Sequence, residues 1–136
     1  MTDPKWSEPA KKEIEAKPDV LWVRVVDYIH GPRKVKIEAT GTWSYAPRSA
    51  CGPDGNVAEG FDDGHLLKTA ARGCLIAKVG GSAGDTPGSE KIQAVGSFAI
   101  FEIGDTGGAL FLAMKDKPQN WDRHSGKLEI SISDAS

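Results

Sequence analysis

Apolar and polar residues alternate in short runs along this chain. Residues 34–40 place Val, Ile and Ala at every second position, and residues 127–133 do the same with Leu, Ile and Ile. A period of two is typical of a half-buried β-strand. We expect further strands at residues 20–26, 74–79, 92–95, 97–103 and 109–114.

Glycine and proline separate these runs. Gly31-Pro32 and residues 52–55 mark turns, and turn signals recur roughly every eight to twelve residues without a long helical pattern. The sequence therefore predicts an all-β fold, an antiparallel jelly-roll β-sandwich. Residues 97–103 and the strand that starts at Ala109 flank a glycine-rich stretch, and we expect them to pair as a hairpin.

The length and charge of the chain fit a single domain. Residues 1–19 are polar and contain three prolines, so we expect a flexible arm or a short helical turn there, followed by one domain over residues 20–136. The formal net charge of -2 offers no basic field for nucleic acid or an anionic membrane. No apolar run approaches the ~20 residues of a membrane span, and the first residues lack a signal-peptide core. We expect cytoplasmic synthesis without a signal peptide, with export by a non-classical route left open.

The two cysteines, Cys51 and Cys74, are too far apart for a CxxC motif, and the three histidines do not cluster near them. This spacing gives no zinc site. A bridge in an oxidising compartment is the alternative, and we favour two free thiols, with Cys74 buried in a strand.

A polar loop over residues 115–126 is the candidate site. It is longer than a hairpin turn needs, and binding groups collect on loops held by rigid strands. Asp116, Asn120 and Asp122 offer oxygens at close spacing, which suits a hard cation such as calcium. The alternative is a solvated loop with an incidental mixture of charges.

Aromatic residues near this loop have two interpretations. Trp121, Trp43 or Tyr45 can offer a flat apolar surface to the C–H face of a sugar ring. The alternative for each is packing in the core, which we expect for Trp43 and for Trp22.

Catalytic patterns are weak. Residues 80–84 match G-x-S-x-G around Ser82, but the following residues contain Pro87 and cannot begin the helix that a nucleophile elbow requires. The aspartates at 62, 63, 116 and 122 offer carboxylates for glycoside hydrolysis, yet nothing apolar beside them raises a carboxyl pKa. We expect no enzyme.

Ordered groups of residues carry a family resemblance. Residues 41–47 (Gly-Thr-Trp-Ser-Tyr-Ala-Pro), 52–55, 73–80, 116–118 and 125–130 resemble, in order and spacing, the bacterial PA-IL (LecA)-like family of galactophilic lectins. The resemblance covers residues 20–133. It implies a small jelly-roll sandwich, commonly tetrameric, in which calcium lies between two loops and coordinates the hydroxyls of galactose.

The resemblance also implies roles for individual residues. Tyr45 matches a position whose backbone carbonyl binds calcium. Asp116 matches a carboxylate that binds calcium and touches the sugar, and Asn120 matches a position that gives calcium a second carbonyl. The family has two consecutive asparagines where this sequence has Arg123 and His124. Neither side chain gives a hard cation a good oxygen.

Two arrangements remain open at this position. Either Asp122 supplies a compensating carboxylate, or Arg123 takes the place of the cation and pairs with Asp116. In the first loop, the positions of the family's galactose contacts fall near Glu59 and near Asp62 or Asp63, so the resemblance does not fix the sugar. The expected sugar-binding residues are Asp116, Asn120, Arg123, Glu59, Asp62 and Asp63, and the expected calcium ligands are Tyr45, Asp116, Asn120 and Asp122.

Three functional hypotheses follow. The first is a non-enzymatic lectin that binds a saccharide or glycoconjugate, and as a homo-oligomer it would gain strength from several linked sites. The second is a PA-IL-like structural or oligomer-assembly module without sugar binding. The third, a small hydrolase that uses Ser82 or an aspartate pair, has the weakest support.

Overall fold

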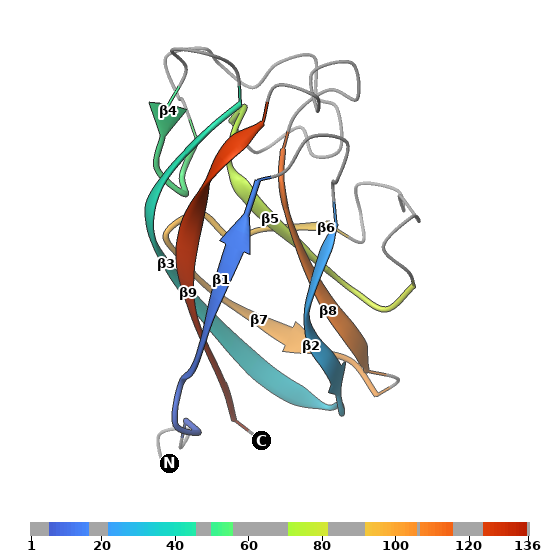
Figure 1. The fold of residues 1–136 in the computed structure, drawn as a ribbon. Helices are drawn as coiled ribbons and strands as arrows, with labels where there is room; N and C mark the ends of the chain where they lie inside the picture. Colours follow the sequence, from blue (N-terminus) through green and yellow to red (C-terminus); the bar gives the residue numbers. More distant parts are fainter. Residues whose placement is uncertain are drawn as a thin grey trace.

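The computed structural model describes residues 6–16, 22–45, 50–55, 71–81, 92–105, 107–115 and 124–135. Within them the chain forms two antiparallel β-sheets that pack face to face (Figure 1). Sheet A contains β1 (Ala10–Glu15), β3 (Arg33–Ser44), β4 (Ala50–Cys51), β7 (Phe98–Ile103) and β9 (Ser125–Ala135). Sheet B contains β2 (Val23–Ile29), β5 (Leu75–Val79), β6 (Ile92–Ala94) and β8 (Gly108–Met114).

The strand order is that of a jelly roll. In sheet A the order is β1-β9-β3, and the far edge of β3 pairs with β7 near one end and with β4 near the other. In sheet B the order is β2-β8-β5-β6. The chain therefore passes repeatedly from one sheet to the other as it runs from β1 to β9. The predicted fold class, an antiparallel jelly-roll sandwich, is confirmed.

The core lies between the sheets and follows the predicted alternation. Val35 and Ile37 of β3 are fully buried, and Ile37 is paired with Ile132 of β9. Leu110 and Leu112 of β8 meet them from sheet B and are also fully buried. A slip of one residue in any of these pairings would turn the apolar set outward, so the pattern fixes the register.

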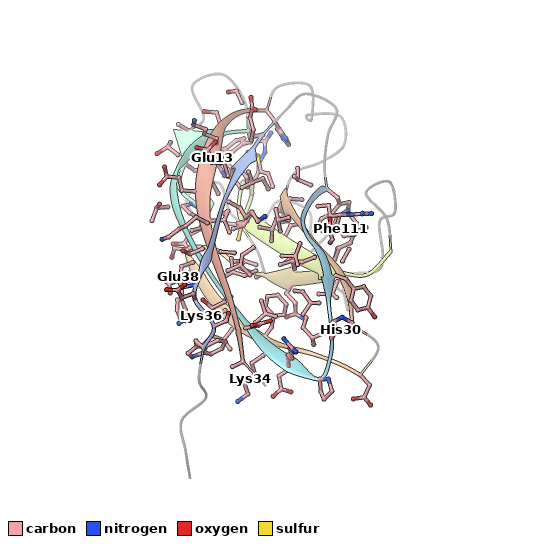
Figure 2. The ribbon with its side chains drawn as sticks, turned by 60° about the horizontal axis from the view of Figure 1, so that its bottom comes forward. Glu13, His30, Lys34, Lys36, Glu38 and Phe111 are labelled. Carbon is pink, nitrogen blue, oxygen red and sulfur yellow. The ribbon has the colours of Figure 1, made fainter. Side chains whose placement is uncertain are left out.

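A second apolar cluster lies on the other face of sheet B. It consists of Trp22, Cys74, Ile76, Ile92, Phe111 and Ala113. The ammonium of Lys78, a residue that is 2% exposed, lies 4.9 Å from the centre of the Trp22 ring and 5.0 Å from that of Phe111. Figure 2 shows Phe111 on the opposite side of the molecule from Glu13 and Glu38. Because β5 and β8 are covered on both faces, residues 109–114 form a continuous apolar run.

The predicted hairpin of residues 97–103 with the strand at Ala109 is wrong. β7 pairs with β3 in sheet A, whereas β8 pairs with β2 and β5 in sheet B. The connection from Ile103 to Gly108 therefore crosses between the sheets. Gly107 has φ +66°, and a Cβ there would overlap the carbonyl oxygen of Ile29. A glycine-rich connection can close a hairpin or lead from one sheet to the other. Here it leads from sheet A to sheet B, because β8 is buried on both faces inside sheet B.

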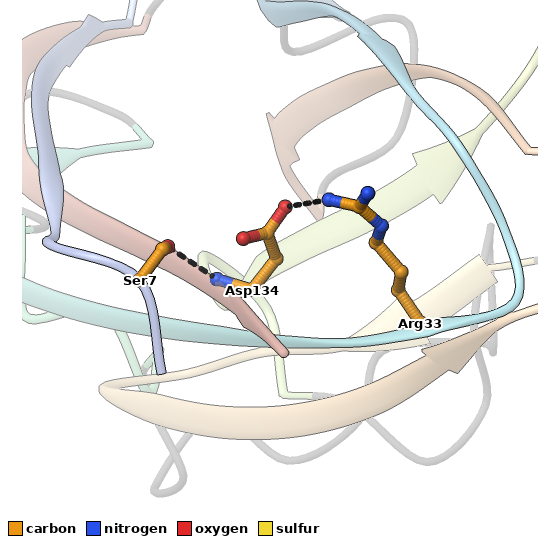
Figure 3. Close-up of polar contacts among 3 residues, drawn as sticks. All are labelled: Ser7, Arg33 and Asp134. Carbon is orange, nitrogen blue, oxygen red and sulfur yellow. Dashed lines mark hydrogen bonds and ion pairs between the residues drawn. The ribbon is translucent and has the colours of Figure 1, made fainter. Parts of the chain in front are cut away.

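The predicted flexible arm or helical turn is wrong for Ala10–Glu15, which form β1. This strand pairs with β9, and Ile14, opposite Leu128, is 2% exposed. Ser7 extends the contact: its amide donates to the Asp134 carbonyl at 2.8 Å, and its hydroxyl accepts from the Asp134 amide at 3.0 Å. Arg33 also pairs with the Asp134 carboxylate at 3.0 Å (Figure 3). Ile14 is the one large apolar residue of this strand, so the local sequence predicts it weakly. The strand forms because it pairs with the otherwise open edge of β9.

The strand expected at residues 20–26 lies further along the chain, because β2 runs from Val23 to Ile29. Leu21, within the expected strand, is outside the described residues. The described part of the chain contains no helix long and apolar enough to cross a membrane.

Replacing Ile14 by alanine tests whether β1 belongs to the sandwich. We expect the free energy of unfolding to fall by about 2 to 4 kcal/mol, because a buried side chain is removed beside Leu128. Chemical denaturation measures this change. The matched control is Lys12→Ala, an exposed position on the same strand that should change stability by less than about 0.5 kcal/mol. Equal stability of both variants would contradict the docking of β1.

Candidate functional site

Four strand ends that border the predicted binding segments meet at one end of the sandwich. Ser44, the last residue of β3, pairs with Ser125, the first of β9. Leu75, the first residue of β5, pairs with Met114, the last of β8. This is the upper end in Figure 1. We call it the loop end and define it by Tyr45, Gly73, Lys115 and His124, which directly adjoin these strand ends or lie two residues from them.

Most of the predicted site residues lie outside the described residues. These are Glu59, Asp62, Asp63, Asp116, Asn120, Asp122 and Arg123, together with Trp121 and Ser82. Their roles stay predictions. Tyr45 is described, and so are the residues from which the two predicted loops depart and to which they return.

Gly73 holds three segments of the loop end together. Its carbonyl accepts a hydrogen bond from the buried Trp43 indole N–H at 2.8 Å, and its amide donates to the Lys115 carbonyl at 2.7 Å. The Lys115 amide in turn donates to the Cys74 carbonyl at 2.8 Å. These bonds fix the point at which the chain leaves β8 for residues 116–123. They also confirm the expected core position of Trp43, which is 1% exposed.

The close packing around Gly73 explains why this position is glycine. Its φ is +85°, and a Cβ there would lie 2.7 Å from the sulfur of Cys51 and 2.9 Å from Cδ1 of Tyr45. Any side chain would therefore displace the end of β3 or β4.

The Tyr45 ring is a structural element of this end. It is 1% exposed, and the guanidinium of Arg72 lies 4.3 Å from its centre, a cation–π contact. The suggestion that the rings of Trp43 or Tyr45 stack on a sugar is therefore wrong, since both are buried. The predicted role of Tyr45 concerns its backbone carbonyl and stays a prediction.

Lys115 and His124, the residues that bound the second predicted loop, are buried. Lys115 is fully buried and His124 is 3% exposed. Lys-Asp-Lys-Pro looks like a solvated turn in the sequence, so the burial of Lys115 was missed. The signal that could have found it is its phase, because Lys115 continues the alternate positions of Phe111 and Ala113, which are buried on the outer face of sheet B.

The two thiols are free, as predicted. Cys74 is 5% exposed, but it lies just before β5, in an isolated bridge opposite Asp54, and not inside the strand. Burial raises the pKa of the Cys74 thiol to about 11 and also raises the pKa of Cys51. Neither environment favours a nucleophilic thiolate.

Asp54 has a structural role at the same end. Its carboxylate accepts hydrogen bonds from the Ser97 amide at 2.8 Å and from the Ser97 hydroxyl at 3.1 Å. This ties the predicted turn at residues 52–55, closed by a bond from the Gly55 amide to the Gly52 carbonyl, to the start of β7. Among the described residues, no three His, Cys, Asp or Glu side chains are grouped to hold a metal ion.

Comparisons with known proteins support the fold. No family model matches the sequence, and no curated protein matches it. Among solved structures the chain is similar to one described as "EclA N-terminal domain; PllA-like lectin", with a TM-score of 0.64. The identity is 15%, over 92% of this chain and 96% of that one. At this identity, the similarity establishes a lectin-like β-sandwich fold.

The raised pKa of Cys74 makes stability depend on alkaline pH. The unfolded thiol, with a pKa near 9.0, loses its proton before the folded one does. The stabilising contribution is complete below about pH 9 and is lost as the pH rises through about 11, a fall of about 2 to 3 kcal/mol in the free energy of unfolding.

Denaturant unfolding of wild type and Cys74→Ala across this pH range measures the effect. Alanine cannot ionise, so we expect the stability advantage of wild type over the variant to shrink as the pH rises. A constant difference between the two proteins would show that burial does not shift this thiol.

Proposed function

We propose that this protein is a non-enzymatic, carbohydrate-binding lectin whose sugar site is at the loop end. The observation that carries the proposal is the convergence of strand ends there. Tyr45 at the end of β3, Lys115 after β8 and His124 before β9 adjoin the segments that contain the predicted binding residues. The similarity of the fold to a PllA-like lectin domain supports the same function.

The base of the proposed site is rigid, which favours binding through loops. The main chain of Lys115 is held at both its amide and its carbonyl by the segment around Gly73. The side chains of Lys115 and His124 are buried. Both ends of the predicted 116–123 loop are therefore fixed, which reduces the conformational entropy lost when a ligand binds. The carboxylates and amide of Asp116, Asn120 and the 59–63 segment would hydrogen-bond to sugar hydroxyls.

Calcium belongs to the proposal as the ion that Tyr45, Asp116, Asn120 and Asp122 would hold. Their carbonyl and carboxylate oxygens are the donors that this ion prefers, and bound calcium would coordinate sugar hydroxyls. With two carboxylates among its four donors, the site carries few negative charges, and we expect a dissociation constant of about 10⁻⁴ to 10⁻³ M.

An oligomer-assembly role is the second candidate. Phe98 and Ile100 lie on β7, a strand at the edge of sheet A, and are 56% and 48% exposed. Exposed large apolar side chains on an edge strand favour association of copies. The two candidates are compatible, because a homo-oligomer would present several sugar sites together.

Asp116→Ala tests the proposed sugar site. We expect at least a ten-fold loss of affinity for the saccharides that wild type binds on a broad glycan array, with galactosides titrated first by calorimetry. The control is Asp105→Ala, in the turn after β7 at the opposite end of the sandwich. Unchanged affinity in Asp116→Ala would move the site elsewhere. An array without hits for wild type, together with a stable oligomer in light scattering, would favour the assembly role.

A thermal melt of metal-stripped protein tests the calcium part. Adding about 5 mM calcium should raise the melting temperature by about 4 to 8 °C, because an ion that binds the native state stabilises it. The rise should disappear in Asp116→Ala. If wild type shows no rise but still binds sugar, the metal part is wrong and the sugar site stands.

A further inference from the structure

A trough crosses the outer face of sheet A, away from the predicted loops. It has a volume of about 570 Å³ and runs over β1, β9 and β3. The side chains that point into it come from two rows of paired positions. Glu13, Glu129 and Thr40 form one row, and Lys11, Ser131 and Glu38 form the next. We call this feature the sheet A trough.

These rows face outward because their neighbours face the core. Ile14 and Leu128 pair on the inner side of the sheet and are buried, as is Ile130. Alternation then places Glu13 and Glu129 on the outer side. Figure 2 shows Glu13, Glu38 and Lys36 along the same side of the molecule.

The middle of the trough holds an unfavourable pair of like charges. Glu13 and Glu129 are directly opposite each other, an arrangement that destabilises a sheet. Lys127 lies 3.5 Å from the Glu13 carboxylate, and Lys36 lies 4.0 Å from that of Glu38. Within the described part of the chain, the carboxylate of Glu129 has no hydrogen bond or ion pair. It is therefore free to accept a hydrogen bond from a ligand in the centre of the trough.

The lining matches a neutral polyhydroxyl ligand. The carboxylates accept hydrogen bonds, the ammonium group of Lys11 donates them, and the hydroxyls of Thr40 and Ser131 do both. Each sugar hydroxyl can likewise donate and accept. Lys11, Lys36 and Lys127 balance the three carboxylates, so the trough has no strong field of either sign, which suits a neutral chain. The volume lies within the ~300 to 1,000 Å³ of small-molecule sites.

An aromatic ring lies beside one end of the trough. The ammonium of Lys36, two residues before Glu38 on the same face of β3, lies 4.8 Å from the centre of the Trp6 ring. Trp6 is partly exposed. Lys36 covers one face of this ring, and the remaining exposed part suits contact with the C–H groups of a sugar.

We propose that the sheet A trough binds a neutral polysaccharide chain, with Glu129 and Ser131 at its centre and Trp6 at one end. The trough spans three strands about 5 Å apart and most of its lining is exposed, so it accommodates internal units of a chain. This surface is separate from the loop end. The protein would then hold saccharide at two places, and the trough does not depend on calcium.

Native electrophoresis in gels that contain a soluble galactan, glucan or mannan tests this proposal. We expect at least one of these polysaccharides to retard wild type. Glu129→Gln keeps the shape of the trough but removes the charge, and should weaken the retardation about ten-fold. The control is Glu102→Gln, an outward position on β7 outside the trough, which should leave it unchanged.

Two further measurements distinguish loss of binding in the trough from unfolding and from binding at the loop end. Glu129→Gln should melt at the same temperature as wild type or higher, because it relieves the charge repulsion with Glu13, so weaker binding cannot come from unfolding. Asp116→Ala should keep the part of the retardation that Glu129→Gln loses, which keeps the trough distinct from the loop-end proposal.

Four results would overturn the proposal. They are no retardation of wild type by any of the three polysaccharides, equal retardation of wild type and Glu129→Gln, loss of retardation in Asp116→Ala alone, and a dimer in light scattering that Glu129→Gln dissociates. The last would show that a second copy of the chain occupies the trough.

Discussion

The pairing of β3 with β9 is the constraint on which the rest of the structure depends. It extends along all 11 residues of β9, from Ser125 opposite Ser44 to Ala135 opposite Lys34. β1 attaches to the free edge of β9, and β4 and β7 attach to that of β3. One end of this ladder brings Tyr45 next to His124, and its outer face forms the floor of the sheet A trough. Both proposed binding surfaces therefore depend on the same register between β3 and β9.

The sequence predicted the parts of this architecture that are local. The alternation in residues 34–40 and 127–133 identified β3 and β9 and their inner faces, because a period of two depends only on neighbouring residues. It did not reveal strand partners. The wrong pairing of β7 with β8 and the missed β1 both concern contacts between residues distant in the chain. β8 is buried on both faces and so lies inside sheet B, and β1 pairs with the open edge of β9.

The sequence predicts the segments of the candidate site, but not the packing of the strand ends that adjoin them. The polar run at 115–126 and the family resemblance pointed to the end of the sandwich where the strands around it meet. The burial of Lys115 depends on packing in three dimensions, and so does the need for glycine at position 73, which packs against Tyr45 and Cys51. Neighbouring residues in the sequence do not reveal this packing. Glu13, Glu38 and Glu129 each look like a solvated position in their own strand. The trough depends on the three strands lying side by side, which no single strand indicates.

The pairing of β1 with β9 also sets the order in which the molecule can be completed. Ala10 lies opposite Ile132, and Ser7 is bonded to the main chain of Asp134. A ribosome produces the first of these strands long before the last, so β1 has no sheet to join until synthesis has reached β9. Sheet A therefore closes only after β9 has been synthesised, and a nascent chain that stops short of β9 exposes the apolar side of β3.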